Sequence, residues 1–217
     1  MPKSNKAGDS FIRTSQRALA LIELHTRLVQ AGVDQRIHSS DLVRSAVVLS
    51  VAAMDAYFTR RFEDIVIPYV KKHGPSPGII ELLQKAGLDT EQALTMATMD
   101  RPFRRVRTLV HSYLETYTTQ RFDVIDQLFL SFGLKDLCAN AQGMTGRKTL
   151  LRSVEILVDR RHKIVHEGDL DGHGKLRRIE PLPTLHRIRD MTLLVRKADE
   201  LIDKAIQEAT AVVYGLG

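Results

Sequence analysis

The sequence predicts an all-α protein folded as a single helical bundle, and three observations support this. Over long stretches of the 217-residue chain, apolar residues recur every three or four positions, which is the spacing of one face of an amphipathic helix. Capping and helix-breaking residues stand at the ends of these stretches. The chain has the length of one ordinary domain and contains no internal repeat, low-complexity tract or second domain.

The N-terminal region is expected to be a short tail followed by a helix. Residues 1–8 are small and polar, so we expect a disordered tail before a single domain over residues 9–217. Asp9 is a suitable N-cap, and the apolar spacing that follows predicts a helix to Ala31. Gly32 then ends this helix.

The second helix is expected to be the longest. Ser39 and Ser40 can cap it, it extends to about Lys72, and Pro68 should kink it because proline removes a backbone N–H. Glycine and proline residues divide the remaining chain into shorter helices. These are expected over residues 79–86, 90–99, 102–118 and 122–132, within 134–146, from 150 to the glycine at 168, and over 184–214, with 168–183 as the longest irregular connection and 175–179 briefly extended.

Composition favours a reducing compartment and an anionic partner. Cys138 is the sole cysteine, so there is no internal disulfide framework, and the N-terminus lacks the charged-then-apolar pattern of a signal peptide. No apolar run approaches the roughly 20 residues of a membrane-spanning helix. The net charge of +6 suits a polyanion, whereas the absence of tryptophan argues against a stacking platform for single strands. We therefore expect a soluble, cytoplasmic protein without a membrane partner.

Two helices each carry one charge within an apolar stripe. In the helix that begins at residue 150, Arg161 falls near the middle of the face that includes Val154 and Val165. In the second helix, Asp55 lies inside the buried stripe. An unpaired buried guanidinium is strongly unfavourable, so the simplest expectation is that Asp55 and Arg161 form an ion pair. Other cations, such as Arg44, are also available to Asp55.

The hexapeptide Arg161-His162-Lys163-Ile164-Val165-His166 resembles the Arg-x4-6-His signature of HEPN domains, in which the residue after the arginine is typically Asn, Asp or His. The surrounding stretch 159–169 and the earlier helical stretch 42–58 are similar to the HEPN branch associated with the RiboL-PSP families. The rest of the chain matches only in being helical. The resemblance implies a helical bundle of the HEPN type.

That resemblance also implies a metal-independent endoribonuclease that needs no cofactor. Cleavage of RNA by its own 2′-hydroxyl requires a proton to be removed, a proton to be delivered and charge on the phosphorane to be cancelled. His166 is the candidate for proton transfer, because histidine exchanges protons near neutral pH. Arg161 would supply a permanent planar cation to the phosphate oxygens. His162 would orient either partner or contact phosphate, and Asp55 would hold Arg161 in place.

A composite site and a biological setting follow from the same resemblance. A homodimer would bring two copies of Arg161 and His166 to one cleft, with RNA as the substrate. The products would be a 2′,3′-cyclic phosphate and a 5′-hydroxyl, and DNA would be inert because it lacks the 2′-hydroxyl. The family implies a toxin or phage-defence role, with an antitoxin or regulatory partner. Some HEPN toxins carry a modifiable Tyr two residues after the motif histidine, where this chain has Gly168, so that route of neutralisation is not expected.

Basic side chains near and away from the motif are candidates for contact with the RNA backbone. Arg160 and Lys163 lie on the solvent side of the motif helix. Arg104 and Arg105 belong to the densest basic cluster of the chain, between residues 101 and 107. A solvated helix surface is the alternative interpretation for all four.

A metal site is the competing chemistry for the motif. His162 and His166 are four residues apart, which places both rings on one helix face. Residues that could complete a ligand set follow in the next turn: Glu167, Asp169 and His173. However, Lys163 stands where zinc proteases carry Glu, so no metal is expected.

Two further classes of function stay open. The first is a non-catalytic HEPN module that dimerises or binds a partner or a nucleotide. An occluded His166 would favour that module. The second is basic nucleic-acid binding without catalysis, which predicts similar affinity for DNA and RNA.

Overall fold

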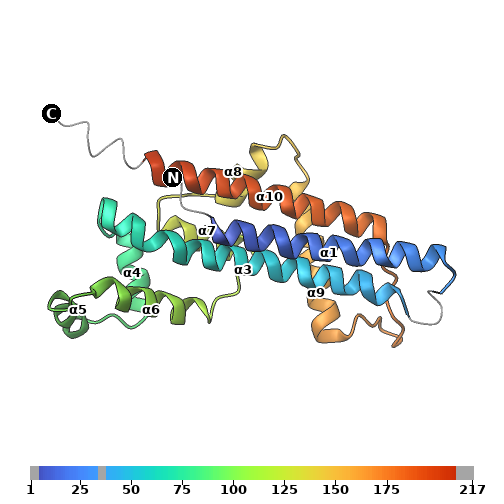
Figure 1. Ribbon diagram of the computed structural model, residues 1–217, viewed down its shortest axis with the longest axis horizontal. Helices are drawn as coiled ribbons and strands as arrows, with labels where there is room; N and C mark the ends of the chain where they lie inside the picture. The colour runs from blue at the N-terminus through green and yellow to red at the C-terminus, as the bar shows by residue number, and fades with distance from the viewer. Residues whose placement is uncertain (1–4, 34–37, 209–217) are drawn as a thin grey trace. The chain divides into compact units, whose positions relative to one another are not determined.

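Every element of regular structure in the described residues is a helix. The computed structural model describes residues 5–33 and 38–208, where an isolated antiparallel bridge between Leu170 and Leu176 is the extent of β pairing. The predicted all-α class is confirmed. The helices are α1 (Lys6–Gln30), α3 (Ser40–His73), α4 (Pro77–Lys85), α5 (Thr90–Ala97), α6 (Pro102–Leu114), α7 (Phe122–Leu130), α8 (Leu137–Gly143), α9 (Leu150–Glu167) and α10 (Pro181–Glu208) (Figure 1).

The helices form two compact units, and the long helices α3 and α10 contribute to both. Unit 1 comprises Met1–Tyr57 and Cys138–Ala198, and unit 2 comprises Phe58–Leu137 and Asp199–Gly217. The motif helix α9 therefore belongs to unit 1. The basic cluster at the start of α6 belongs to unit 2.

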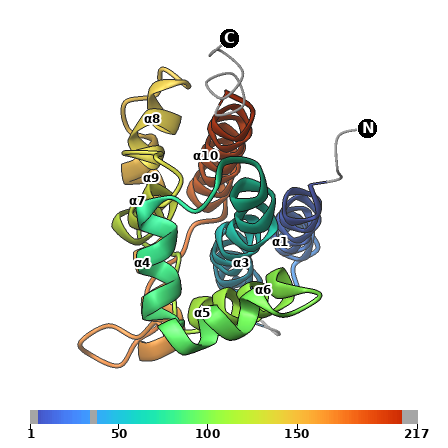
Figure 2. The same ribbon diagram turned by 90° about the vertical axis from the view of Figure 1, so that its left-hand side faces the viewer.

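In unit 1, α1 packs beside the first half of α3, with α9 and the first part of α10 completing the core (Figure 1, Figure 2). The rings of Phe11 and Tyr57 join α1 to α3, with centroids 5.7 Å apart. Ser153 on α9 donates a 2.6 Å hydrogen bond to the Asp190 carboxylate on α10. Apolar side chains of all these helices fill the interior, among them Ala18, Val47, Met54, Val154, Ile188 and Leu194.

In unit 2, aromatic rings from α3 and α7 build the core. Phe129 contacts both Phe58 and Phe62 edge-on, with centroids 5.9 Å away in each case. All three rings are fully buried. Edge-to-face pairs of this kind add favourable electrostatics to the burial of apolar area. At the polar side of the unit, Arg61 forms an ion pair with Asp199, with Nε 2.9 Å from the carboxylate oxygen.

The first helix begins earlier than the sequence predicted. The side chain of Asn5 accepts a 2.9 Å hydrogen bond from the backbone N–H of Gly8, so Asn5 is the N-cap and Asp9 lies within the first turn. Residues 6–8, expected in a disordered tail, are therefore helical. Residues 1–4, the rest of that predicted tail, lie outside the described residues.

The last helix also begins before its predicted start. It starts at Pro181 rather than Thr184, because prolines in a first turn remove only N–H groups that have no helical partner. Its described part ends at Glu208, so the predicted extension to Tyr214 lies outside the described residues. Helix α6 ends at Leu114, four residues before the predicted end at Thr118.

Helix α3 contains a longer apolar stretch than the sequence analysis predicted. By length and composition alone it is a candidate membrane span, with a mean hydropathy of 1.4 over its most apolar 18 residues. Of that stretch, 56% is buried inside the structure, as in the core helix of a globular protein. Pro68 lies inside the helix, in its last turns.

Candidate functional site at the end of α9

The last turns of α9 leave the core of unit 1. Leu150, Val154 and Leu157 are buried, but Val165, on the same side of the helix, is 46% exposed. Both views show this end of α9 extending past α1 and the first half of α3 (Figure 1, Figure 2). The predicted apolar face therefore continues into solvent beyond the residues that the neighbouring helices cover. Arg161 stands at this transition and is half-buried.

A left-handed turn ends the helix where glycine was expected to end it. Gly168 has φ +63°, and its backbone N–H bonds to the carbonyl of Lys163. Asp169 follows with φ +59° and donates its own N–H to the same carbonyl at 3.0 Å. Glycine and aspartate are among the residues that tolerate this region best. The turn directs the Asp169 side chain back into the protein.

Asp169 is fully buried and holds two arginines. One carboxylate oxygen accepts hydrogen bonds from Arg44 Nε at 2.7 Å and from Arg160 Nη2 at 2.8 Å. Arg44 comes from the start of α3, so the carboxylate links α3, α9 and the turn. Charge-assisted bonds of this length are among the stronger ones in proteins.

The same arginines hold the loop that follows. Arg44 donates to the carbonyl oxygen of Arg177 at 2.6 Å, and Arg160 donates to the carbonyls of Arg177 and Arg178 at 3.2 and 3.0 Å. Further along, backbone N–H groups of His173 and Lys175 donate to the Asp171 carboxylate. These bonds keep the pKa of Asp171 below its usual range. The connection between α9 and α10 is thus an ordered loop.

The ion pair expected between Asp55 and Arg161 does not form. Asp169 takes the role of buried carboxylate, and its arginine partners are Arg44 and Arg160. Arg161 has no hydrogen bond or ion pair with any residue in the described ranges, and its Nε is buried without a partner. Its neighbour Arg160 was expected on the solvent side, where it would contact RNA. Arg160 instead forms an ion pair with Asp169. Arg161 lies where α9 leaves the core, so its side chain is only half-buried.

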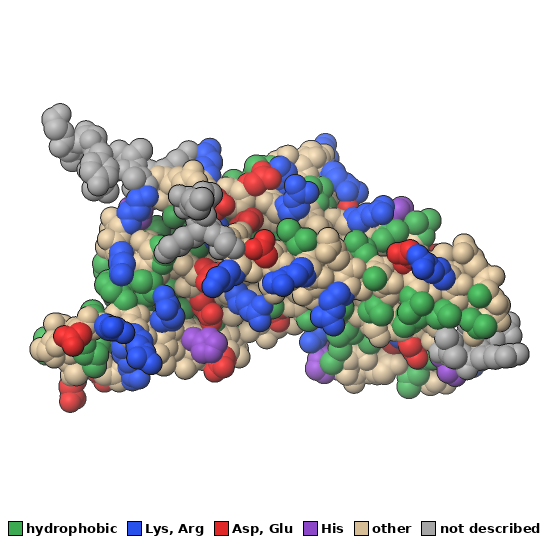
Figure 3. Space-filling model, viewed as in Figure 1, with side chains coloured by type: hydrophobic (Ala, Val, Ile, Leu, Met, Phe, Trp, Pro, Cys, Tyr) green, Lys and Arg blue, Asp and Glu red, His purple; other side chains and the backbone are tan. Residues whose placement is uncertain are grey.

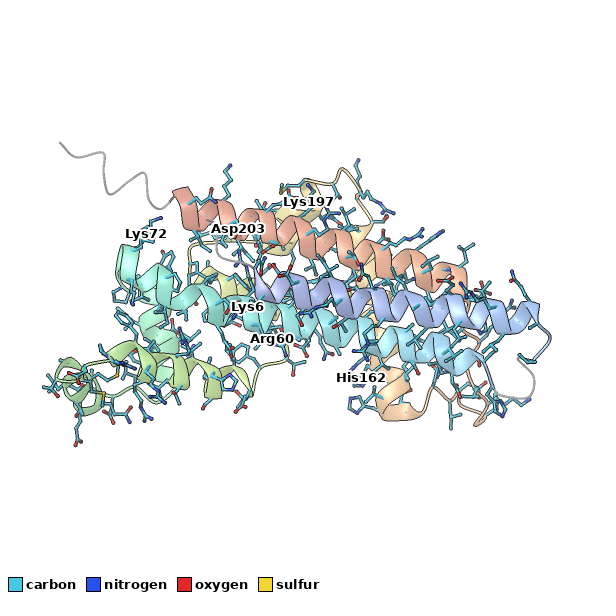
Figure 4. The ribbon with its side chains drawn as sticks, viewed as in Figure 1. Lys6, Arg60, Lys72, His162, Lys197 and Asp203 are labelled. Atoms are coloured by element: carbon cyan, nitrogen blue, oxygen red, sulfur yellow. The ribbon has the colours of Figure 1, made fainter. Side chains whose placement is uncertain are left out.

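The two motif histidines lie together on an exposed face of α9. The ring centroids of His162 and His166 are 4.6 Å apart, with planes inclined by 41°. Both side chains are exposed. Figure 4 shows His162 at the surface, projecting from the last turns of α9. The pair therefore offers imidazole nitrogens to a ligand in solution, in the same last turns of α9 that carry Arg161.

The competing metal interpretation lacks a third ligand in the part of the chain that the structure describes. No group of three or more His, Cys, Asp or Glu side chains there is arranged to hold an ion. Asp169, one of the residues considered for this role, is buried and bound to arginines. The ion pair between Asp169 and Arg44 was not predicted from the sequence.

The remaining RNA-contact candidates divide between the units. Lys163 on α9 lines a cavity in unit 1. Arg104 and Arg105 are exposed on α6 in unit 2 and form no ion pair within the described residues. Figure 3 shows Lys and Arg side chains gathered over α6 on this face. Lys163 in unit 1 and the two arginines in unit 2 are therefore available to bind a polyanion.

The chain matches no protein-family model, no curated protein and no solved structure. The resemblance to HEPN domains therefore rests on the motif, on the stretch 159–169 around it and on the helical stretch 42–58.

Proposed function

We propose that this protein is a metal-independent endoribonuclease of the HEPN type. One observation carries the proposal: the last turns of α9 carry Arg161, which has no partner among the described residues, and the exposed pair His162 and His166. A surface that presents an unpaired guanidinium and two imidazoles has the groups that RNA cleavage by the 2′-hydroxyl requires.

Each side chain has a distinct part in this reaction. His166 removes the proton from the 2′-hydroxyl or delivers one to the leaving 5′-oxygen, and a second His166 from another subunit performs the complementary transfer. Arg161 cancels charge on the pentavalent phosphorane, for which a planar guanidinium is suited. His162 orients its ring neighbour, since the two rings are in contact.

The proposed active unit is a homodimer joined near the end of α9. The exposed Val165 continues the buried stripe of this helix, so a second copy that covers it would complete the apolar face. A two-fold axis there would bring two copies of Arg161 and His166 together. The guanidinium of Arg161, which makes no bond to the described residues, would then contact the substrate phosphate.

The test is cleavage of total RNA by the purified protein in excess EDTA. We expect the wild type to cut RNA to products with 2′,3′-cyclic phosphate ends, whereas Arg161→Ala and His166→Ala lose activity by at least about a hundredfold. Two controls carry the same substitutions at exposed sites outside the motif. Arg152→Ala, on α9, and His173→Ala, in the following loop, should keep wild-type activity.

Several outcomes would contradict the proposal. Cleavage that EDTA abolishes would restore the metal site, and equal cleavage of DNA would exclude attack by the 2′-hydroxyl. Absence of cleavage by a wild-type protein of verified dimeric state would favour the non-catalytic binding module. Loss of activity in the control variants would show that the effect of the substitutions is not specific to the motif residues.

The biological setting belongs to the proposal as well. A cytoplasmic toxin or phage-defence nuclease should arrest growth when expressed alone in a bacterial host, and a regulatory partner should relieve this. We expect Arg161→Ala to abolish the growth arrest at equal protein level. Growth arrest that persists in this variant would separate the toxicity from RNA cleavage.

A further inference from the structure

A cavity of about 510 Å³ opens beside α9 in unit 1, apart from the exposed histidine face. It lies between α3, α9, the start of α10 and the segment that precedes α10. Apolar side chains form part of its wall: Val47, Ile156, Leu157, Ile179 and Pro183. Its volume falls within the roughly 300–1,000 Å³ of pockets that take small molecules.

The charged groups of this cavity are mostly basic. They are Arg160, Lys163, Arg178, Arg187, Asp159 and Glu180. Two of the cations already have carboxylate partners, because Arg160 binds Asp169 and Arg178 lies 3.2 Å from Glu180.

Two cations in the cavity wall have no such partner. The side chains of Lys163 on α9 and Arg187 on α10 form no hydrogen bond or ion pair with any other residue in the described ranges, and both are partly buried. Asp159 precedes Lys163 by one helical turn but does not pair with it, and its side chain is exposed. Lys163 and Arg187 come from separate helices and line one cavity.

We infer that this cavity binds a small phosphate ester with an apolar body. A phosphate group carries up to two negative charges at one end, which matches the two unpaired cations Lys163 and Arg187. The rest of the ligand would lie against the apolar wall formed by Ile156, Leu157 and Pro183. An uncharged ligand would leave both cations without a partner, and inorganic phosphate alone would leave the wall hydrated.

A nucleoside monophosphate has this chemistry and serves as the probe. Its phosphate meets the cations, its base covers apolar surface, and its ribose hydroxyls can donate to Asp159 or Glu180 at the rim. A nucleoside phosphate ester occurs both in a free nucleotide and in an RNA strand. Binding requires no reacting group at the end of α9, so the inference is independent of ribonuclease activity.

The experiment is isothermal titration calorimetry of the full chain with AMP, adenosine and inorganic phosphate. AMP should bind, and adenosine and inorganic phosphate should each bind at least about tenfold more weakly. Lys163→Ala and Arg187→Ala should each weaken the binding of AMP by about tenfold or more. Arg189→Ala is the matched control, because Arg189 is exposed on the same helix two residues away and does not line the cavity; it should leave binding unchanged.

A second titration separates the two sources of the phosphate. A short RNA with 2′-O-methyl groups, which the proposed reaction cannot cut, is compared with AMP in the same variants. If the binding of AMP depends on Lys163 and Arg187, the cavity is a site for free nucleotides. If only the binding of the RNA depends on these two residues, the cavity is a site for an RNA strand. Absence of binding by both, or an equal loss in Arg189→Ala, would overturn the inference. Circular dichroism confirms that each variant is folded.

Discussion

The carboxylate of Asp169 should be one of the most sensitive polar groups in unit 1. It is fully buried and bonded to Arg44 and Arg160, and Arg44 itself is 7% exposed. The variant Asp169→Asn keeps the size of the side chain and removes its charge. Asn also tolerates the left-handed backbone at this position, so the variant tests the ion pairs without adding strain.

The expected loss follows from the partners that are left behind. Removing one member of a buried ion pair costs about 3–5 kcal/mol. Here Arg44 keeps Asp41 and the carbonyl of Arg177, and the amide oxygen of the variant can still accept one hydrogen bond. We therefore expect Asp169→Asn to lower the free energy of unfolding by about 2 kcal/mol. Asp169→Ala should lower it by about a further 1 kcal/mol, because alanine disfavours positive φ.

Urea denaturation followed by circular dichroism measures these changes. The control is Asp171→Asn, in the same loop, where the side chain is half-buried, has no ion pair with the described residues and keeps an amide oxygen that can still accept the backbone hydrogen bonds. We expect the control to change stability by less than about 0.5 kcal/mol. An equally small change for Asp169→Asn would refute the reasoning, since it would mean that the two arginines do not depend on this carboxylate.

Three other substitutions test local features of the two units. Gly168→Ala should lower the free energy of unfolding by about 1 kcal/mol, because the position has φ +63°. Gly78→Ala should lower it by about 1–3 kcal/mol, because the new Cβ would lie 2.9 Å from the Cα of Ser131. Glu63 raises the pKa of His111, so this ion pair stabilises the fold below about pH 6.5 and is lost as pH rises through the raised pKa. Glu63→Gln should lower that pKa in an NMR titration and remove this pH dependence.

Each of these has a control at a comparable position. Gly172→Ala, in the loop, and Gly143→Ala, in α8, add a Cβ that meets nothing within 4 Å at ordinary backbone angles, so neither should destabilise appreciably. Glu115→Gln removes the weaker carboxylate neighbour of His111, whose oxygen lies 3.6 Å from the ring, and should shift its pKa less than Glu63→Gln does. Equal effects in variant and control would contradict the structural reason given for each.

The helices were largely predictable because their ends are local. Gly168 ends α9 through its left-handed conformation, and Ser76 and Asp89 cap α4 and α5 through hydrogen bonds to residues three positions on. The errors also have local causes. Asn5 replaced Asp9 as the cap of α1, and the prolines at the start of α10 were interpreted as loop although a first helical turn accepts them.

The candidate site was predictable only in part, because its contacts span the chain. The spacing of His162 and His166 placed both rings on one face, and the structure brings them into contact. The buried pair of Arg44 and Asp169 joins residues 125 positions apart, which no local pattern reveals. The expectation for Arg161 assumed that neighbouring helices cover the whole apolar face of α9. They cover it only as far as the last turns.

The buried carboxylate also decides which arginine can serve the motif. Both Arg160 and Arg161 precede His166 at a spacing that the Arg-x4-6-His signature allows, so the sequence leaves two choices. Arg160 is bound to Asp169 and to the loop carbonyls, and withdrawing it would leave a buried carboxylate with one partner fewer. Arg161 can turn toward a phosphate without breaking any bond to the described residues, because it makes none. The role proposed for a cation at the cleaved phosphate therefore falls to Arg161, while Arg160 holds the turn that positions the end of α9.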